Sequence, residues 1–171
     1  MPYWQNGRRD AGNVSMGNGG LMFYAALAAL LCGADCLIKY AIERNHPDGV
    51  IKPVWKGRLL IRKFHNTGAM LNLGAARQQI MAFISLIFTV FMSGVFVATL
   101  GTKGRHMLKS GLSLILGGAF SNTYDRLMRK YVVDYVSFNV PYPRLRRIVF
   151  NISDFGIMIG SCLMVISQMR K

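Results

Sequence analysis

A chain of 171 residues has the length of one domain, and 52% of its residues are hydrophobic while 16% are charged. Soluble domains carry about 25% charged residues, so this composition argues against a soluble globular protein and favours one that lies in a membrane. The net charge of +14 points to anionic lipid head groups. The basic residues lie in loops between apolar segments rather than on one soluble face, which argues against nucleic acid as a partner.

The pattern along the chain predicts a tail followed by a single transmembrane domain. Residues 1–20 are polar and rich in Gly and Asn, which is typical of a flexible tail, and residues 21–171 form the predicted domain. Four apolar runs in this domain have about the length that a membrane-spanning helix needs. They cover residues 21–42, 80–100, 107–124 and 148–167. Four crossings place both termini on one side of the membrane, and the first and third loops on the other.

The first loop, residues 43–79, contains two stretches in which apolar residues alternate with basic ones, residues 50–55 and 58–64. Alternation with a period of two predicts short amphipathic strands. Trp55 and Phe64 suit the head-group layer, so we expect these strands to lie close to the membrane surface.

No pattern of cysteines and histidines predicts a metal site, a cofactor or a disulfide. Cys32 and Cys36 are four residues apart on the first apolar run, and Cys162 lies on the fourth. None of these spacings is typical of zinc ligands or of a disulfide framework. We therefore expect three reduced, buried and structural thiols.

Three acids lie in or beside the apolar runs on the side of the long loops. Asp125 ends the third run, Asp134 lies in the third loop (residues 126–147), and Asp154 lies near the start of the fourth run. An acid within a membrane span is costly and is by default a functional candidate. Two carboxylates held close together share one proton, so that one can act as a base and the other as an acid on a water and a peptide carbonyl. The alternative for Asp134 is an ordinary solvated loop acid.

Three asparagines accompany these acids at short spacings or from the first loop. They are Asn66, Asn122 and Asn151. Amides hold a carboxylate or a substrate backbone without adding charge, which suits a site of low dielectric constant. They also join neighbouring helices in membranes, so a purely structural role stays open.

Two pairs of charged residues in or beside the runs have two interpretations each. Asp35 and Lys39 have the i, i+4 spacing of an intrahelical ion pair, which either belongs to the site or lets a charged helix insert. The adjacent Asp125 and Arg126 either cap the third run or place a guanidinium where it can bind a carboxylate or a lipid phosphate. Lys109, near the other end of that run, is expected to snorkel towards the interface.

Five short motifs follow one another along the chain. They are Asp35-x-x-x-Lys39, Asn66-Thr67-Gly68-Ala69, Gly117-Gly118-Ala119-Phe120-Ser121-Asn122-Thr123-Tyr124-Asp125-Arg126, Val132-Val133-Asp134-Tyr135 and Phe150-Asn151-Ile152-Ser153-Asp154. In order, spacing and placement they resemble the motifs of bacterial lipoprotein signal peptidase, also called signal peptidase II. There the corresponding motifs read D-Q-x-x-K, N-x-G-A, G-G-A-x-G-N-x-x-D-R, V-V-D-F and F-N-x-A-D. The resemblance covers nearly all of the chain from Leu21 onward.

The resemblance implies an intramembrane aspartic endopeptidase that removes the signal peptide of prolipoproteins just before a diacylglyceryl-modified cysteine. It assigns catalysis to Asp134 and Asp154. Substrate-binding or supporting roles then fall to Asp35, Lys39, Asn66, Gly118, Asn122, Asp125, Arg126 and Asn151. The implied fold is an all-α membrane protein with four transmembrane helices, a small extracytoplasmic β-cradle built by the first loop, and an interfacial helix. The implied partners are prolipoproteins, membrane lipids and inhibitors of the globomycin type, with no metal or cofactor.

Several residues depart from the family motifs and are expected to change the lining of the substrate pocket. They are Cys36, Ser121, Lys130, Ser153 and Phe155, together with residues 70–73. Two other classes of function stay open beside the peptidase. One is a catalytically silent membrane protein that binds lipid or lipoprotein without cleavage. The other is a small transporter or channel subunit, although the sequence has no inverted repeat.

The orientation in the membrane rests on the resemblance, which implies a bacterial cell (inner) membrane with the active site at the extracytoplasmic face. The positive-inside rule points the other way, because the first and third loops hold thirteen Lys and Arg. The other side holds seven, in the tail, the second loop, the adjoining start of the third run (Lys109) and the C-terminus. We expect five basic residues to hold the first loop on anionic lipid, with ordinary solvated side chains as the alternative. They are Lys52, Lys56, Arg58, Arg62 and Lys63.

Overall fold

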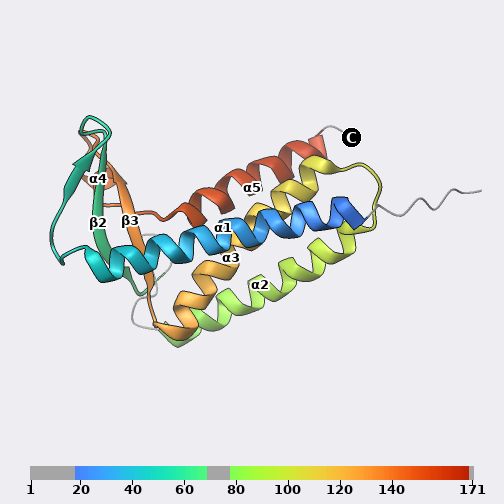
Figure 1. Ribbon diagram of the computed structural model, residues 1–171, viewed down its shortest axis with the longest axis horizontal. Coiled ribbons are helices and arrows are strands. Elements are labelled where there is room, and N and C mark those ends of the chain that lie inside the picture. Colours follow the sequence, from blue (N-terminus) through green and yellow to red (C-terminus); the bar gives the residue numbers. More distant parts are fainter. Residues whose placement is uncertain (1–17, 69–77, 170–171) are drawn as a thin grey trace, which may run out of the picture.

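The computed structural model describes residues 18–68 and 78–169, which form five helices and three strands. The elements are α1 (Asn18–Asn45), β1 (Lys52–Val54), β2 (Leu59–Asn66), α2 (Gln78–Leu100), α3 (His106–Met128), β3 (Val132–Phe138), α4 (Pro143–Arg146) and α5 (Ile152–Met169). The four long helices run alongside one another, and the sheet stands at one end of them (Figure 1). The start of α1 and the end of α5 lie together at the other end, as the pattern of four runs predicted.

Three of the long helices, α1, α2 and α5, are long and apolar enough to cross a membrane, with mean hydropathies of 2.1, 2.4 and 1.5. Their outer faces are apolar and exposed, as at Phe83 and Val97 on α2. Apolar side chains on the outside of a bundle are typical of a lipid-facing surface. The protein is therefore mostly helical and multi-pass.

Helix α3 differs from the other three because it lies in the middle of the bundle and carries many small and polar residues. It crosses behind α1, between α2 and α5, and packs against all three (Figure 1). A Cβ atom at Gly118 would lie 2.5 Å from the Ser153 carbonyl oxygen, and one at Gly160 would lie 2.5 Å from the Gly111 carbonyl oxygen. Glycine at these positions lets the backbones of α3 and α5 touch.

The sheet has three antiparallel strands in the order β1-β2-β3. The two strands predicted in the first loop are confirmed, with bounds shifted by a few residues. The third strand corrects the expectation that the first loop alone builds the sheet. It comes from the segment predicted as the third loop, and it carries Asp134. The residues from Val132 to Tyr135 are all buried. The protein is therefore mostly helical with a small sheet, as predicted, but both long loops build that sheet rather than the first loop alone.

The predicted bounds of the helices are close at most ends and wrong at the start of the last one. Residues 148–151 do not belong to α5, because Phe150 pairs with Val136 in an isolated antiparallel bridge instead. At the other predicted boundary, α3 continues to Met128, so Asp125 lies inside its last turn rather than at its end.

Two expectations about single side chains are also wrong. Lys109 does not snorkel: it is fully buried, and its ammonium donates to the carbonyl oxygens of Leu100 at 3.2 Å and Thr102 at 2.5 Å. The Leu100 carbonyl belongs to the end of α2, where a helix leaves its last acceptors unpaired, and Thr102 lies in the turn that follows. The three thiols are reduced but not buried, since Cys162 is exposed and the other two are partly exposed.

Three expectations stay predictions: the flexible tail, the departures at 70–73 and the interfacial helix. The predicted tail lies, as far as residue 17, outside the described residues, and so do the departures at 70–73. Helix α4 is the one short helix in the described part of the chain, and an interfacial position for it stays a prediction.

Candidate active site

The candidate site is a cavity at the sheet end of the bundle, where β3, the second half of α3 and the start of α5 meet. It has a volume of about 200 Å³ and is open on one side. Its polar lining consists of Asn66, Asn122, Arg126, Asp134 and Asp154. Its apolar lining consists of Val132, Ile148, Val149, Phe150, Ile157 and Met158. Two carboxylates, two amides and one guanidinium therefore face a small space with apolar walls.

Asp134 enters the site from the middle of β3. In the sheet register it lies opposite Phe64 of β2, which makes Asn66 its diagonal neighbour on the same face. The Asn66 amide donates to Asp134 Oδ2 at 3.0 Å, and the Asn151 amide donates to Asp134 Oδ1 at 2.7 Å. A strand thus holds this carboxylate in a fixed direction, and the expectation of a solvated loop acid is wrong.

Burial, followed by the neighbouring negative charge of Asp154, raises the pKa of the Asp134 carboxyl to about 7. The hydrogen bonds from Asn66 and Asn151 and the charge of Lys39 act against this rise. A carboxyl with a pKa near 7 exchanges its proton at neutral pH, which is the property that a general acid or base needs.

Asp154 is fixed by the first turn of α5. The Asn151 side chain accepts a hydrogen bond from the Asp154 backbone N–H at 2.9 Å, and the Asp154 carboxylate accepts one from the Asn151 N–H at 3.1 Å. This reciprocal pair is a capping box, which satisfies two N–H groups that a helix start leaves free. The Asn122 amide donates to the other carboxylate oxygen at 3.0 Å. Helix capping therefore sets the direction of the second acid.

The two acids are connected through a pair of amides. The Asn151 amide that donates to Asp134 also donates to Asn122 Oδ1 at 3.3 Å, and Asn122 in turn donates to Asp154. The three predicted asparagines thus contact the predicted acids directly.

Lys39 of α1 supports this arrangement through buried contacts outside the cavity lining. Its ammonium, which is completely buried, pairs with Asp35 at 2.7 Å and with Asp125 at 3.1 Å. It also donates to Asn122 Oδ1 at 2.8 Å, which is the amide that holds Asp154. The i, i+4 ion pair of the first helix is therefore present, and it extends to the candidate site. A lysine between two buried aspartates keeps their charges compensated.

Asp125 and Arg126 do not pair with each other. Asp125 Oδ2 accepts from Lys39 and from the Val133 backbone N–H, so this carboxylate fixes the start of β3. Arg126 lines the cavity and donates to the Gly68 carbonyl oxygen at 3.3 Å. Of the predicted supporting residues, Gly118 alone acts only through packing, because it brings α3 close to α5.

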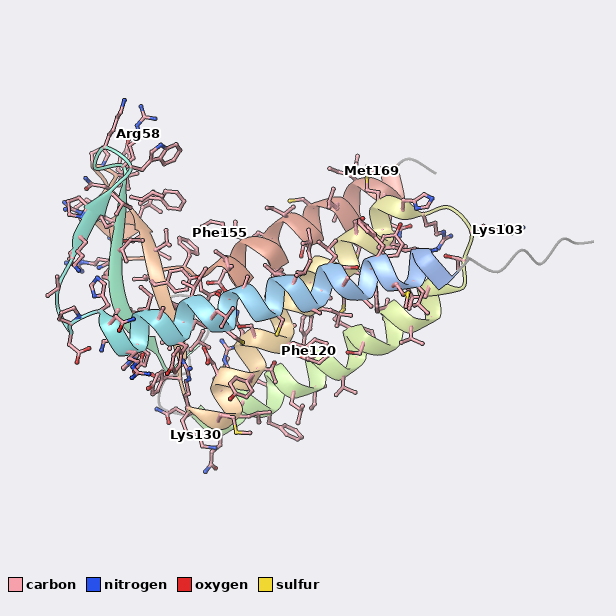
Figure 2. The ribbon with its side chains drawn as sticks, in the orientation of Figure 1. Arg58, Lys103, Phe120, Lys130, Phe155 and Met169 are labelled. Carbon is pink, nitrogen blue, oxygen red and sulfur yellow. The ribbon has the colours of Figure 1, made fainter. Side chains whose placement is uncertain are left out.

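The departures from the family motifs that lie within the described residues are not part of the cavity lining. Ser121 and Ser153 are completely buried and donate to Asp35. Phe155 packs against Phe138 and Phe150 with ring centroids 6.2 and 5.5 Å away, between the sheet and α5 (Figure 2). The expectation that these residues change the lining is wrong for all three in the described structure. The sequence did not reveal these contacts, because the spacing of small residues along a helix does not indicate which serine contacts a carboxylate on another helix.

Comparison with known proteins gives the same family in two ways. The model of the family described as signal peptidase (SPase) II matches residues 27–170. The lipoprotein signal peptidase of Bacillus subtilis (strain 168) is 34% identical over 152 residues, which cover 86% of this chain and 94% of that protein.

Two solved bacterial membrane enzyme structures have the same fold. One has a TM-score of 0.76 at 22% identity and covers 91% of both chains. The other has a TM-score of 0.71 at 23% identity and covers 90% of this chain and 95% of that one. The chain is a multi-pass membrane peptidase that belongs to the signal peptidase II family.

Proposed function

We propose that the protein is an aspartic endopeptidase, which removes the signal peptide of diacylglyceryl-modified prolipoproteins just before the lipidated cysteine. The observation that carries this proposal is the shared cavity of Asp134 and Asp154, with amide donors on both carboxylates and a raised pKa on the first. Family membership and the relative named as a lipoprotein signal peptidase support the substrate class.

The two acids act as a pair that shares one proton. The ionised carboxylate takes a proton from a water molecule, and the water oxygen attacks the carbonyl carbon of the scissile peptide. The protonated carboxyl gives its proton to the carbonyl oxygen, so that a neutral tetrahedral diol forms. The carboxyl that took the water proton then gives it to the amide nitrogen as the C–N bond breaks. A hydroxyl of the diol returns its proton to the other carboxylate, so the pair again holds one proton. Because the proton belongs to the pair, neither acid needs a fixed role before substrate binds.

The other polar residues position the acids and the substrate backbone. Asn66, Asn122 and Asn151 hold the carboxylates without adding charge, which keeps the pair able to share its proton. Arg126 presents a guanidinium to the cavity, where it can donate to a carbonyl of the bound peptide. Asp35, Lys39 and Asp125 fix Asn122 and the start of β3 from behind.

We further propose that α3 crosses the membrane as a fourth, inner helix. Its composition is less apolar than that of the other three, but α1, α2 and α5 surround it, so its polar residues do not meet lipid. We also propose that the membrane is the bacterial inner membrane, and that the sheet end and the cavity lie at its extracytoplasmic face. Cyclic peptides of the globomycin type are the inhibitors to test on this cavity.

The experiment that tests the function is a gel-shift assay with purified protein in detergent and a diacylglyceryl-modified prolipoprotein. We expect a shift to the mature size in the presence of EDTA, because the mechanism uses no metal, and no shift for the same prolipoprotein without its diacylglyceryl group. Binding of the modified substrate without a shift would favour the catalytically silent alternative instead.

A further inference from the structure

Asp35 of α1 is a completely buried carboxylate that accepts hydrogen bonds from three hydroxyl groups on three other elements. Ser121 and Ser153 each donate to its Oδ2 at 2.6 Å, and Tyr135 donates to its Oδ1 at 2.9 Å. Lys39 adds the compensating charge at 2.7 Å. A carboxylate has about four acceptor positions on its two oxygens, so four donors satisfy it.

Each of the three hydroxyl residues is the sequence neighbour of a residue that forms the candidate site. The pairs are Tyr135 with Asp134 on β3, Ser153 with Asp154 on α5, and Ser121 with Asn122 on α3. One carboxylate on α1 thereby ties together the three elements that carry the two acids and the amide that links them.

Tyr135 has a second contact that strengthens this tie. Its hydroxyl oxygen accepts a hydrogen bond from the Ile152 backbone N–H at 3.1 Å, in the first turn of α5. Burial, followed by the negative charge of Asp35, raises the pKa of the Tyr135 phenol. The phenol therefore keeps its proton at neutral pH and acts as a donor.

We propose that Asp35 is a positioning residue, and that Ser121, Ser153 and Tyr135 form with it a hydroxyl clamp that sets the distance between Asp134 and Asp154. This inference rests on the proposed function. The clamp is a feature of this chain, because the family motifs given above have Gly, Ala and Phe at these three positions, none of which has a side-chain donor. Cys36, which also departs from the motifs, joins the cluster, since its Sγ lies 3.6 Å from Ser121 Oγ.

The test removes the hydroxyls one at a time, as Ser121→Ala, Ser153→Ala and Tyr135→Phe, in the full-length protein. A displacement of about 1 Å costs up to about a hundredfold in rate, so we expect kcat to fall roughly tenfold for each variant while KM stays within twofold. Ser113→Ala is the matched control, because Ser113 is an equally buried serine of α3 whose hydroxyl donates to the Lys109 carbonyl oxygen of its own helix. Its kcat should not change.

The energetic coupling between each hydroxyl substitution and Asp35→Asn distinguishes a clamp from three separate packing contacts. If the hydroxyls act through Asp35, then their removal in an Asp35→Asn background should lower kcat by less than twofold further. Losses that multiply in that background would overturn the proposal. So would losses of kcat that appear only in proportion to a lowered melting temperature.

A readout without substrate keeps the clamp testable apart from the function. The carboxyl of Asp134 can be titrated by difference infrared spectroscopy, with Asp134→Asn used to assign its band. In the hydroxyl variants Asp154 moves away, so the pKa of Asp134 should fall below that of the parent protein, while Ser113→Ala leaves it unchanged. An unchanged pKa in all three variants overturns the clamp even if the parent protein cleaves nothing, and lack of cleavage alone overturns only the proposed function.

Discussion

Asp134 is the residue whose ionisation should govern the pH dependence of the reaction. Its pKa is raised to about 7 by burial and by the charge of Asp154. The mechanism needs one proton on the pair, and this proton is lost as the pH rises through that value. We therefore expect kcat to fall between pH 7 and pH 9. A pH–rate profile under substrate saturation checks this, and a kcat that stays flat or rises over that interval would contradict it.

The same shift predicts how stability depends on pH. In the unfolded chain the Asp134 carboxyl releases its proton near its ordinary pKa of 3.8, whereas in the folded protein it keeps the proton up to about pH 7. The folded state binds more protons in that window, so this group lowers the free energy of unfolding as the pH rises from about 4 to about 7. Thermal unfolding in detergent should show a smaller decline over this range for Asp134→Asn than for the parent protein. Equal declines in the two proteins would argue against a raised pKa.

At the scale of residues, the sequence predicted the polar members of the candidate site and the buried charges behind them, but it missed the hydroxyl groups that donate to Asp35. Asp134, Asp154 and the three asparagines stand out because polar groups beside apolar runs are rare and short motifs surround them. Ser153 does not stand out, because its partner Asp35 is 118 positions away. A serine within an apolar helix commonly bonds to its own backbone, so its type alone does not reveal a distant carboxylate.

Lys130, directly after α3, has a backbone φ of +71° and an exposed side chain. The left-handed region costs a residue with a Cβ atom about 1 kcal/mol or more, and glycine is the preferred residue just past a helix end. Lys130→Gly should therefore raise the free energy of unfolding by about 1 kcal/mol without changing activity. Lys130→Ala is the control, because it removes the ammonium but keeps the strain. Thermal or denaturant unfolding checks both, and stabilisation by alanine as much as by glycine would refute the backbone explanation.

The β1–β2 hairpin carries basic residues at the tip that points away from the helices, where Arg58 is labelled in Figure 2. Lys52, Lys56 and Arg58 are exposed. The other two residues of the predicted basic set are partly engaged within the protein. Arg62 donates to the Arg146 carbonyl oxygen, and Lys63 pairs with Asp48 at 2.8 Å. Of the basic set, Lys52, Lys56 and Arg58 therefore remain exposed to an anionic lipid surface, with the Arg58 guanidinium 5.9 Å from the centre of the Trp55 ring.

We expect the triple change Lys52→Gln, Lys56→Gln, Arg58→Gln to raise the apparent KM for lipidated substrate in anionic bilayers. In neutral detergent it should change little, because the attraction is between exposed cations and lipid charge. The matched control is Lys103→Gln with Arg105→Gln, at the opposite end of the helices (Figure 2). An equal effect of the hairpin variant in bilayers and detergent would leave these residues as ordinary solvated side chains.

At the scale of elements, the helices could be predicted from apolar runs and the last strand could not. The segment Val132–Phe138 is rich in β-branched and aromatic residues, but the prolines that follow it and the short distance to the third run favoured a loop. Its pairing partner, β2, lies about 70 residues earlier, so only the tertiary structure reveals the strand. The start of α5 was missed for a similar reason, because Phe150 is apolar but belongs to a bridge with β3.

The whole molecule has two ends that face opposite sides of a membrane if all four long helices cross it. The sheet and the cavity lie at one end, and the turn between α2 and α3, with Lys103, lies at the other (Figure 2). We expect the sheet end to be extracytoplasmic. A membrane-impermeant thiol reagent applied to intact cells should label Lys52→Cys and not Lys103→Cys, each in a background in which Cys32, Cys36 and Cys162 are replaced by alanine. Labelling of the second position and not of the first would reverse the orientation.

The order of the apolar runs was sufficient to predict which segments share an end of the molecule. Orientation could not be predicted in the same way, because the charge count and the family resemblance point in opposite directions. Of the cations at the sheet end, Lys63 pairs with Asp48 at 2.8 Å, and Arg62 donates to a neutral carbonyl and keeps its charge.

The central claim is that Asp134 and Asp154 together perform the cleavage. The most direct measurement is kcat for a diacylglyceryl-modified prolipoprotein with Asp134→Asn, Asp154→Asn and Asp48→Asn, the last being a control at an exposed acid of the first loop. The pair acts as a unit, so each of the first two variants should lose several orders of magnitude in kcat. All three should insert in the membrane, and the control should keep its activity. Near-normal turnover by either Asp134→Asn or Asp154→Asn would contradict the account.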